Sequence, residues 1–307
     1  MTRTLLLLAA VAAVVAVGLF WVLTIPQTVS ESALGAHKPN LDNGRTLFFI
    51  GGCASCHATY GDKDPSKLGG RMTLETPFGN FYPPNISPDP DYGIGRWTEV
   101  QFVSAMTKGT ADDEHLYPVF PYPSYQRMTT NDLRDLFAFL KTLPKVTNTD
   151  TMPPQEGGPT FPFNIRRFIG LWKLLFLDGL PFQPDPQKPD DWNRGAYLVN
   201  GPGHCAECHS PRNFLGAIKS GMRFTGGPTP DGKDWVPNIT QYSLGKWSES
   251  DIAEMLATGK IPGDRVGGAM VDVVRNTAQL SPEDRQAIAV YIKSLPPVQG
   301  LSPPRQQ

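Results

Sequence analysis

Two five-residue stretches with the same pattern constrain this chain more than any other feature. Residues Cys53–His57 read CASCH, and residues Cys205–His209 read CAECH. Cys-x-x-Cys-His is the attachment pattern of c-type haem. Two thiols one helical turn apart can bond to the two vinyl groups of one porphyrin, and the adjacent histidine then supplies the proximal iron ligand. Each stretch therefore predicts one covalently bound haem c.

The cysteine inventory favours haem over a redox pair or a zinc site. The chain has four cysteines, and all of them fall in the two stretches: Cys53, Cys56, Cys205 and Cys208. A structural zinc ion needs four ligands, and neither stretch offers four locally. We therefore expect the cysteines to hold two haems, with His57 and His209 as the proximal iron ligands.

The length of 307 residues is enough for two domains of about 100–150 residues each. The chain has 30 Gly and 31 Pro. Such a composition suits small haem domains, in which short helices are joined by long loops around the cofactor. The net charge of −1 gives no reason to expect a nucleic-acid partner.

The N-terminus carries an apolar run from Leu5 to Ile25, interrupted only by Gly18 and Thr24. At about 1.5 Å per residue this run spans roughly 31 Å, the thickness of a bilayer core. We interpret residues 1–26 as a retained single-pass anchor in a bacterial inner membrane. The alternative is a cleaved signal peptide, although no Ala-x-Ala site follows the run. Either interpretation places the haem domains in the periplasm.

The second half of the chain repeats landmarks of the first in the same order. Cys53 to Pro144 spans 91 positions, as does Cys205 to Pro296 (144 − 53 = 296 − 205). This repetition predicts a duplicated haem domain. The matched segments are Pro84–Ile86 with Pro237–Ile239, Trp97–Glu99 with Trp247–Glu249, and Phe139–Pro144 with Tyr291–Pro296.

Six segments follow from these landmarks. A tether, residues 27–40, leads into a first haem domain, residues 41–148. A connector, residues 149–190, joins it to a second haem domain, residues 191–299. Residues 300–307 form a C-terminal tail. With the anchor, the predicted fold is mainly α.

Three helices of the first domain have recognisable starts. Asp42 or Asn43 can cap a helix at residues 45–50. Thr98 opens a capping box for a helix that runs to about Lys108. Thr129 precedes a helix at residues 131–143, in which apolar residues recur at helical spacing before Pro144 ends it.

The sixth iron ligands are expected to be methionines, as in cytochromes that only carry electrons. Met270 lies in the loop before the last helix of the second domain and is the candidate there. For the first domain the candidate is Met128. His115 competes with it by chemistry and position, and open coordination is the third possibility.

Other repeated residues have two interpretations each. Trp97 and Trp247 either bond a haem propionate or pack at a helix start. Asn85 and Asn238 either form turns or touch a haem edge. The connector segment from Phe161 to Leu177 is rich in Phe, Leu, Ile and Trp. We interpret it as packed between the haem domains, the alternative being a helix on the membrane surface.

The chain resembles the membrane-anchored cytochrome c subunits of periplasmic dehydrogenases, such as alcohol and gluconate dehydrogenases, over about residues 40–298. The resemblance rests on residues 51–57 (GGCASCH), Leu116–Tyr122 (LYPVFPY), Asn193–Leu198 (NRGAYL) and Gly267–Met270 (GGAM). It implies two tandem class I-type cytochrome c domains. Those subunits commonly have three haem motifs, whereas this chain has two, and some have Met where Phe120 stands here.

The predicted function is electron transfer without a catalytic residue of its own. The chain would take electrons from a periplasmic dehydrogenase and pass them to a quinone, a soluble cytochrome or a terminal oxidase. One alternative is a dihaem enzyme, a thiosulfate dehydrogenase or a peroxidase, which needs an iron with an open sixth position. Another alternative is a dihaem subunit of a terminal oxidase.

Overall fold

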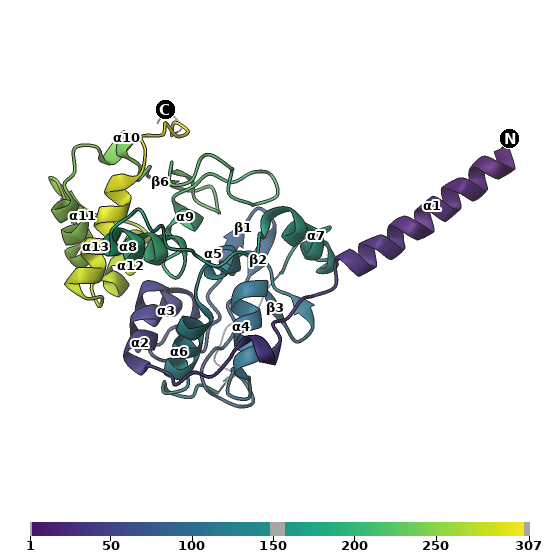
Figure 1. Cartoon of the computed structure of the whole chain (residues 1–307), viewed down its shortest axis with the longest axis horizontal. Coiled ribbons are helices and arrows are strands. Elements are labelled where there is room, and N and C mark those ends of the chain that lie inside the picture. Colours follow the sequence, from purple (N-terminus) through teal and green to yellow (C-terminus); the bar gives the residue numbers. More distant parts are fainter. Residues whose placement is uncertain (1, 148–156, 304–307) are drawn as a thin grey trace.

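The computed structural model describes residues 2–147 and 157–303, so the predicted boundary at residue 148 and the last four tail residues lie outside the described part. The described chain is mainly helical, and its strands form two-stranded antiparallel hairpins. Figure 1 shows a rounded body from which one long helix projects. The prediction of a mainly α fold with an N-terminal apolar helix is thereby confirmed.

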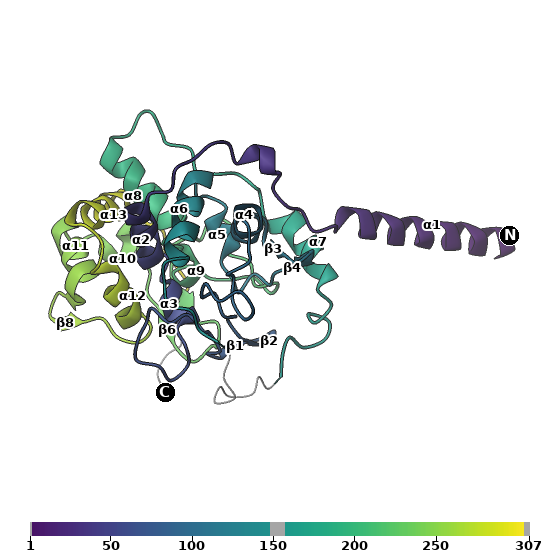
Figure 2. The same cartoon turned by 90° about the horizontal axis from the view of Figure 1, so that it is seen from below.

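The projecting helix α1 runs from Thr2 to Leu23 and has no buried residue. Its mean hydropathy of 2.8 and its length suit a membrane span, although a signal sequence would have the same character. Both views show it leaving the body at one side (Figures 1 and 2). Residues 24–40, with the short 3₁₀ helix Glu31–Ala33, then lead back along the body.

The first unit of the body comprises residues 41–147. Helix α2 (Leu41–Ile50) packs across α6 (Thr130–Leu140), and α4 (Glu99–Lys108) packs beside α6. The short helices are α3 (Cys53–His57) and α5 (Tyr122–Tyr125). The hairpins pair β1 (Leu74–Thr76) with β2 (Gly79–Phe81) and β3 (Thr110–Ala111) with β4 (Glu114–His115).

The second unit, residues 190–299, has the same order of elements with one helix, α10, added. Helix α8 (Asp190–Asn200) packs across α13 (Pro282–Ser294), and α11 (Glu249–Thr258) packs beside α13. The shorter helices are α9 (Cys205–Cys208), α10 (Gln241–Leu244) and α12 (Met270–Thr277). The hairpins pair β5 (Gly227–Pro228) with β6 (Trp235–Val236) and β7 (Lys260–Ile261) with β8 (Asp264–Arg265). Helix α7 (Arg167–Phe176) lies between the units in sequence.

A glycine marks the principal helix crossing in each unit. A Cβ on Gly44 of α2 would lie 2.2 Å from the carbonyl oxygen of Asp135 in α6. A Cβ on Gly195 of α8 would lie 1.9 Å from the carbonyl oxygen of Ala287 in α13. Only a residue without a side chain allows the two backbones to approach so closely.

The observed N-terminal caps of the helices can be compared with the predicted ones. The capping box of Thr98 with Gln101 and the cap by Thr129 are confirmed. The predicted cap of α2 was wrong: Asn40 accepts from the backbone N–H groups of Asp42 and Asn43, so the helix begins at Leu41. An Asx side chain just outside the first turn satisfies these donors better than one inside it.

The end of α6 also differs from the prediction. The helix stops at Leu140, three residues before the expected position. After Lys141, the backbone N–H groups of Thr142 and Leu143 bond to the carbonyls of Phe139 and Leu140, three residues back. This 3₁₀-type tightening ends the helix before Pro144.

The two units share one continuous hydrophobic core. Leu47 and Leu133 of the first unit and Leu198 and Ile252 of the second are fully buried members of it. The units are therefore fixed against each other by packed side chains and not merely linked by the connector.

Candidate haem sites

The first motif forms a short helix that follows a sharp turn. Gly52 has a left-handed backbone (φ 55°), which starts α3 immediately after α2 ends. The Nδ1–H of His57 donates to the carbonyl of Pro84 at 2.8 Å. The carbonyl fixes the ring and leaves Nε2 unprotonated, which is the form that ligates iron.

The second motif repeats this geometry. His204 takes the left-handed position (φ 37°) before α9. The Nδ1–H of His209 donates to the carbonyl of Pro237, again at 2.8 Å. The matched hydrogen bonds of His57 and His209 show that both histidines are oriented in the same way.

The protonation states suit attachment and ligation. Burial and the neighbouring Cys56 raise the pKa of the Cys53 thiol to about 12, and burial with the neighbouring Cys208 raises that of Cys205 to about 12. Burial also lowers the pKa values of His57 and His209. The thiols are free and protonated, and the imidazoles are neutral, as iron ligands are.

The donor set at each motif fits covalent haem c. It consists of two thiols on one helical turn, available to add to two vinyl groups, and one oriented imidazole. A zinc site does not fit, because no group of three or more His, Cys, Asp and Glu side chains gathers as metal ligands in the described part of the chain.

The asparagines after the two repeated prolines, Asn85 and Asn238, each hydrogen-bond to a distant part of their own unit. The side-chain amide of Asn85 donates to the Val146 carbonyl at 2.6 Å, and that of Asn238 donates to the Val298 carbonyl at 2.8 Å. Each thereby ties the loop that holds a proximal histidine to the chain beyond the last helix of its unit. Their side-chain oxygens also accept from the backbone N–H groups of Ser87 and Thr240, two residues further on, which favours the turn interpretation. Trp97 and Trp247 pack against the core.

Met270 is predicted in the loop before the last helix, α13, but it begins a separate short helix, α12, that precedes α13. Gly268 has a left-handed backbone (φ 56°), so the chain turns early and the backbone N–H of Val271 bonds to the carbonyl of Gly268. The Met270 side chain is half-buried and packs against the core.

Met128 is buried, with 2% of its surface exposed, and immediately precedes the cap of α6. The backbone N–H of Leu116 bonds to the Gly109 carbonyl, and that of Val266 bonds to the Gly259 carbonyl. These equivalent bonds show that corresponding residues of the two units differ by 150 in number at this point. In that register Phe120 stands where Met270 stands (270 − 150 = 120). The helix caps Thr129 and Ser281 are 152 positions apart and place Met128 opposite Leu280.

His115 is fully engaged elsewhere. Its Nε2–H donates to the carbonyl of Thr24 at 2.8 Å, and its Nδ1 accepts from Lys173 at 3.0 Å. Both ring nitrogens are occupied, and burial lowers the pKa of the imidazole. This geometry offers no nitrogen to an iron, so His115 serves to join α1, α7 and the first unit.

The structure brings the two motifs together across the contact between the units. His204, next to Cys205, donates from Nε2 to the carbonyl of Gly51 at 3.1 Å. Ser124 donates to Glu207, inside the second motif, at 2.7 Å. Asn276 donates to Ser55, inside the first motif, at 3.0 Å. Sequence reasoning missed these links, because no local pattern connects residues so far apart in the chain.

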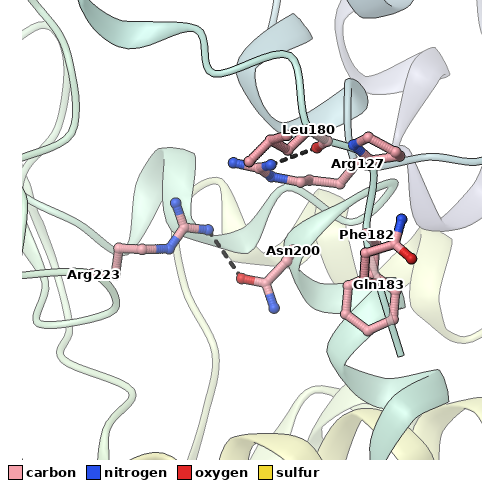
Figure 3. A pocket seen from close by; sticks show the side chains of 7 residues that line it. Arg127, Leu180, Phe182, Gln183, Asn200 and Arg223 are labelled. Atoms are coloured by element: carbon pink, nitrogen blue, oxygen red, sulfur yellow. Dashed lines mark hydrogen bonds between the residues drawn. The ribbon is translucent and has the colours of Figure 1, made fainter. Parts of the chain in front are cut away.

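A cavity of about 440 Å³ lies on the same contact between the units (Figure 3). Residues of both units and of the connector line it, and no motif residue is among them: Arg127, Leu180, Pro181, Phe182, Gln183, Asn200 and Arg223. Figure 3 shows Arg127 bonded to the Leu180 carbonyl and Arg223 bonded to Asn200. Arg127 also pairs with Asp178. Arg127 therefore joins segments of the chain, whereas Arg223 also interacts electrostatically with Cys205 and Glu207 of the second motif.

Comparison with known proteins agrees with the geometry. The family model described as cytochrome c matches residues 41–144, the first unit. A dihaem cytochrome c-type protein of Cereibacter sphaeroides is 46% identical over 260 residues, which cover 83% of this chain and 86% of that protein.

Two dehydrogenase subunits are also similar. The fructose dehydrogenase cytochrome subunit of Gluconobacter japonicus is 38% identical over 88% of this chain and 55% of its own length. The cytochrome c subunit of the quinone alcohol dehydrogenase of Gluconacetobacter polyoxogenes is 38% identical over 88% of this chain and 59% of its own. The chain thus spans little more than half of these subunits. It belongs to the cytochrome c family that includes dihaem c-type cytochromes and the cytochrome c subunits of such dehydrogenases.

Proposed function

We propose that this chain is a dihaem electron carrier that takes electrons from a dehydrogenase partner. The two tandem cytochrome c domains are residues 41–148 and 191–299, joined by a connector at residues 149–190. Cys53 and Cys56 hold one haem c and Cys205 and Cys208 the other. Bound haem supplies an iron that changes between the ferrous and ferric states by one electron.

The observation that carries this proposal is the contact between the two attachment helices. The His204–Gly51 bond joins the residue before Cys205 to the turn before Cys53. The Asn276–Ser55 bond adds a second link. A shared core then holds both motifs at a fixed separation. Fixed separation favours electron transfer within the molecule, because no domain motion is needed for the donor and acceptor to meet.

The partners follow from the relatives. The names of the fructose and alcohol dehydrogenase subunits indicate a dehydrogenase as electron donor. The alcohol dehydrogenase is named for quinone. The acceptor of this chain is accordingly a quinone, a soluble cytochrome or a terminal oxidase, and the chain itself has no catalytic residue. Helix α1 is the anchor, which places the haem domains in the periplasm at the inner membrane.

His57 and His209 would hold the two haem irons from one side, and Met128 and Met270 would be their second protein ligands. A methionine at the sixth position leaves no open site for peroxide or a sulfur compound. This coordination separates a carrier from the two enzyme alternatives, a thiosulfate dehydrogenase and a peroxidase.

The test is reduction of the purified full chain. The denatured protein in pyridine should show two c-type haems per polypeptide. Addition of a dehydrogenase that co-purifies with it, together with that enzyme's substrate, should reduce both haems. The chain alone should not oxidise alcohols, sugars or thiosulfate, nor reduce peroxide. Turnover by the chain alone would contradict the carrier proposal, and one haem per polypeptide would contradict the second domain.

A further inference from the structure

Helix α7 has an apolar outer face. Phe168, Leu171, Leu174 and Leu175 are 43%, 38%, 57% and 69% exposed. Their spacing places them on one side of the helix. The helix contains no acidic residue. Single apolar residues scattered over a protein surface are common, but four large ones on one face of a helix form a continuous patch. Such a patch is suited to contact with an apolar surface.

The start of α7 is fixed to the end of α1. The rings of Phe20 and Phe168 pack edge to face with their centroids 5.7 Å apart. The Arg167 guanidinium lies 4.6 Å from the centre of the Trp21 ring and donates to the Trp21 carbonyl at 2.6 Å. Both views show α7 beside the end of α1 that enters the body (Figures 1 and 2).

The middle of α7 packs just as closely on the chain that follows α1. Thr24 is buried, and a Cβ on Gly170 would lie 2.5 Å from the Thr24 Cβ. The absence of a side chain at Gly170 is what permits this approach. The position of α7 relative to the end of α1 is therefore set by packing and not by the flexible tether.

The inner face of α7 is fixed to both units. Lys173 donates to the carbonyl of Gly109 in the first unit at 2.6 Å. The indole of Trp172 donates to the carbonyl of Leu215 in the second unit at 2.9 Å. The contacts of the inner face agree with the interpretation of this segment as a packed connector. The outer face stays exposed in the structure.

If α1 spans a membrane, its position sets the depth of this outer face relative to the lipid. Phe20 and Trp21 stand at the end of the apolar helix, where aromatic residues mark the boundary between membrane and water. Phe168 touches Phe20 directly, so the first turn of α7 lies at that boundary. Arg167 is held there by Trp21, and Arg166 pairs with Glu114, so the contact with the end of α1 and not a free positive charge sets the position of this turn.

We propose that the outer face of α7 lies in the headgroup and upper acyl region of the lipid bilayer, as a second membrane contact beside α1. This inference rests on the proposed retention of α1 as an anchor. The two contacts together fix how the haem units are oriented above the membrane, which a single helix followed by a tether would leave free.

The test uses the full-length, haem-loaded protein in lipid nanodiscs of phosphatidylcholine and phosphatidylglycerol. A nitroxide label is attached to Leu175→Cys, the only free thiol when the four native cysteines carry haem. Its collision rates with dissolved oxygen, which concentrates in lipid, and with a water-soluble nickel chelate are measured by electron paramagnetic resonance. The matched control is Tyr242→Cys on α10, an aromatic position that is 57% exposed and lies on an element far from α1 in both views.

The oxygen-to-nickel ratio at residue 175 should exceed that at residue 242 by about fivefold or more, as expected for a side chain at interfacial depth. Equal ratios in disc-bound, haem-loaded protein would overturn the inference, leave the electron-carrier proposal intact and assign the face to a protein partner. Loss of the haem protein from the discs would overturn the anchor proposal and this inference with it.

Discussion

At the scale of single residues, one methionine in each unit is proposed as an iron ligand, and the two lie in unlike positions. Met270 begins a helix and is half-buried, whereas Met128 is almost wholly buried before a helix cap. Phe120 occupies the place in the first unit that Met270 occupies in the second. The ligand of the first haem is therefore the more informative one to measure.

Met270→Ala should remove the red charge-transfer band of Met-ligated ferric haem from the second haem, leaving about half of the total. Met128→Ala should remove the other half. Each measurement needs only the absorption spectrum of the oxidised, purified protein, with Met255→Ala, a residue inside α11, as the control that leaves the band intact. An unchanged band in Met128→Ala would remove Met128 from the coordination sphere.

Lys173 should make stability depend on pH. Burial lowers the pKa of its amine to about 7 from an ordinary value of 10.5. Between about pH 7 and 10 the unfolded chain holds a proton that the folded chain lacks, so this group makes the folded state more stable as pH rises. Below pH 7 the amine is protonated in both states, and the cost of charging it in a buried site is fully present.

The comparison with Lys173→Met isolates this effect, because Met keeps the apolar stem without the charge. The thermal midpoint of the native chain relative to that of the variant should increase from pH 7 to pH 9.5. The measurement is a pair of melting curves at each pH. A difference between the two proteins that stays constant with pH would show that the amine titrates normally.

At the scale of elements, the crossing of α8 over α13 depends on Gly195. Gly195→Ala places a methyl group 1.9 Å from the Ala287 carbonyl oxygen, so the helices must move apart. Overpacking of this kind costs about 1–3 kcal/mol of the free energy of unfolding. The expected result is a lower denaturation midpoint, measured by far-ultraviolet circular dichroism.

The matched control is Gly267→Ala in the same unit. A Cβ at that position meets nothing within 4 Å, so its midpoint should stay close to that of the native chain. Equal midpoints for the two variants would show that the crossing tolerates separation. Gly44→Ala should behave as Gly195→Ala does, because a Cβ there would lie 2.2 Å from Asp135.

At the scale of the whole molecule, α1 should decide where the protein resides. Replacement of residues 1–26 by a cleavable export signal should move the two-haem protein from washed membranes into the soluble periplasmic fraction. The reason is that no other described helix is long and apolar enough to span a bilayer. Fractionation followed by haem staining measures the result, and a native chain found without residues 1–26 would instead indicate a signal peptide.

Much of this molecule was predictable from local sequence patterns. The features that were not predicted share one cause. The haem motifs, the caps at Thr98 and Thr129 and the repeated order of elements depend on neighbours within a few residues. The bond from His204 to Gly51 and the capture of His115 by Thr24 and Lys173 join residues that are distant in sequence. Such contacts are set by how the units pack, which spacing alone does not encode.

The link between His204 and Gly51 also bears on how the protein is made. After the units have docked, Cys53, Cys56 and Cys205 are partly exposed and Cys208 is exposed. An enzyme that joins haem to a cysteine needs access to that thiol. Because Cys208 remains exposed in the assembled chain, docking of the units does not by itself close the second motif to such an enzyme.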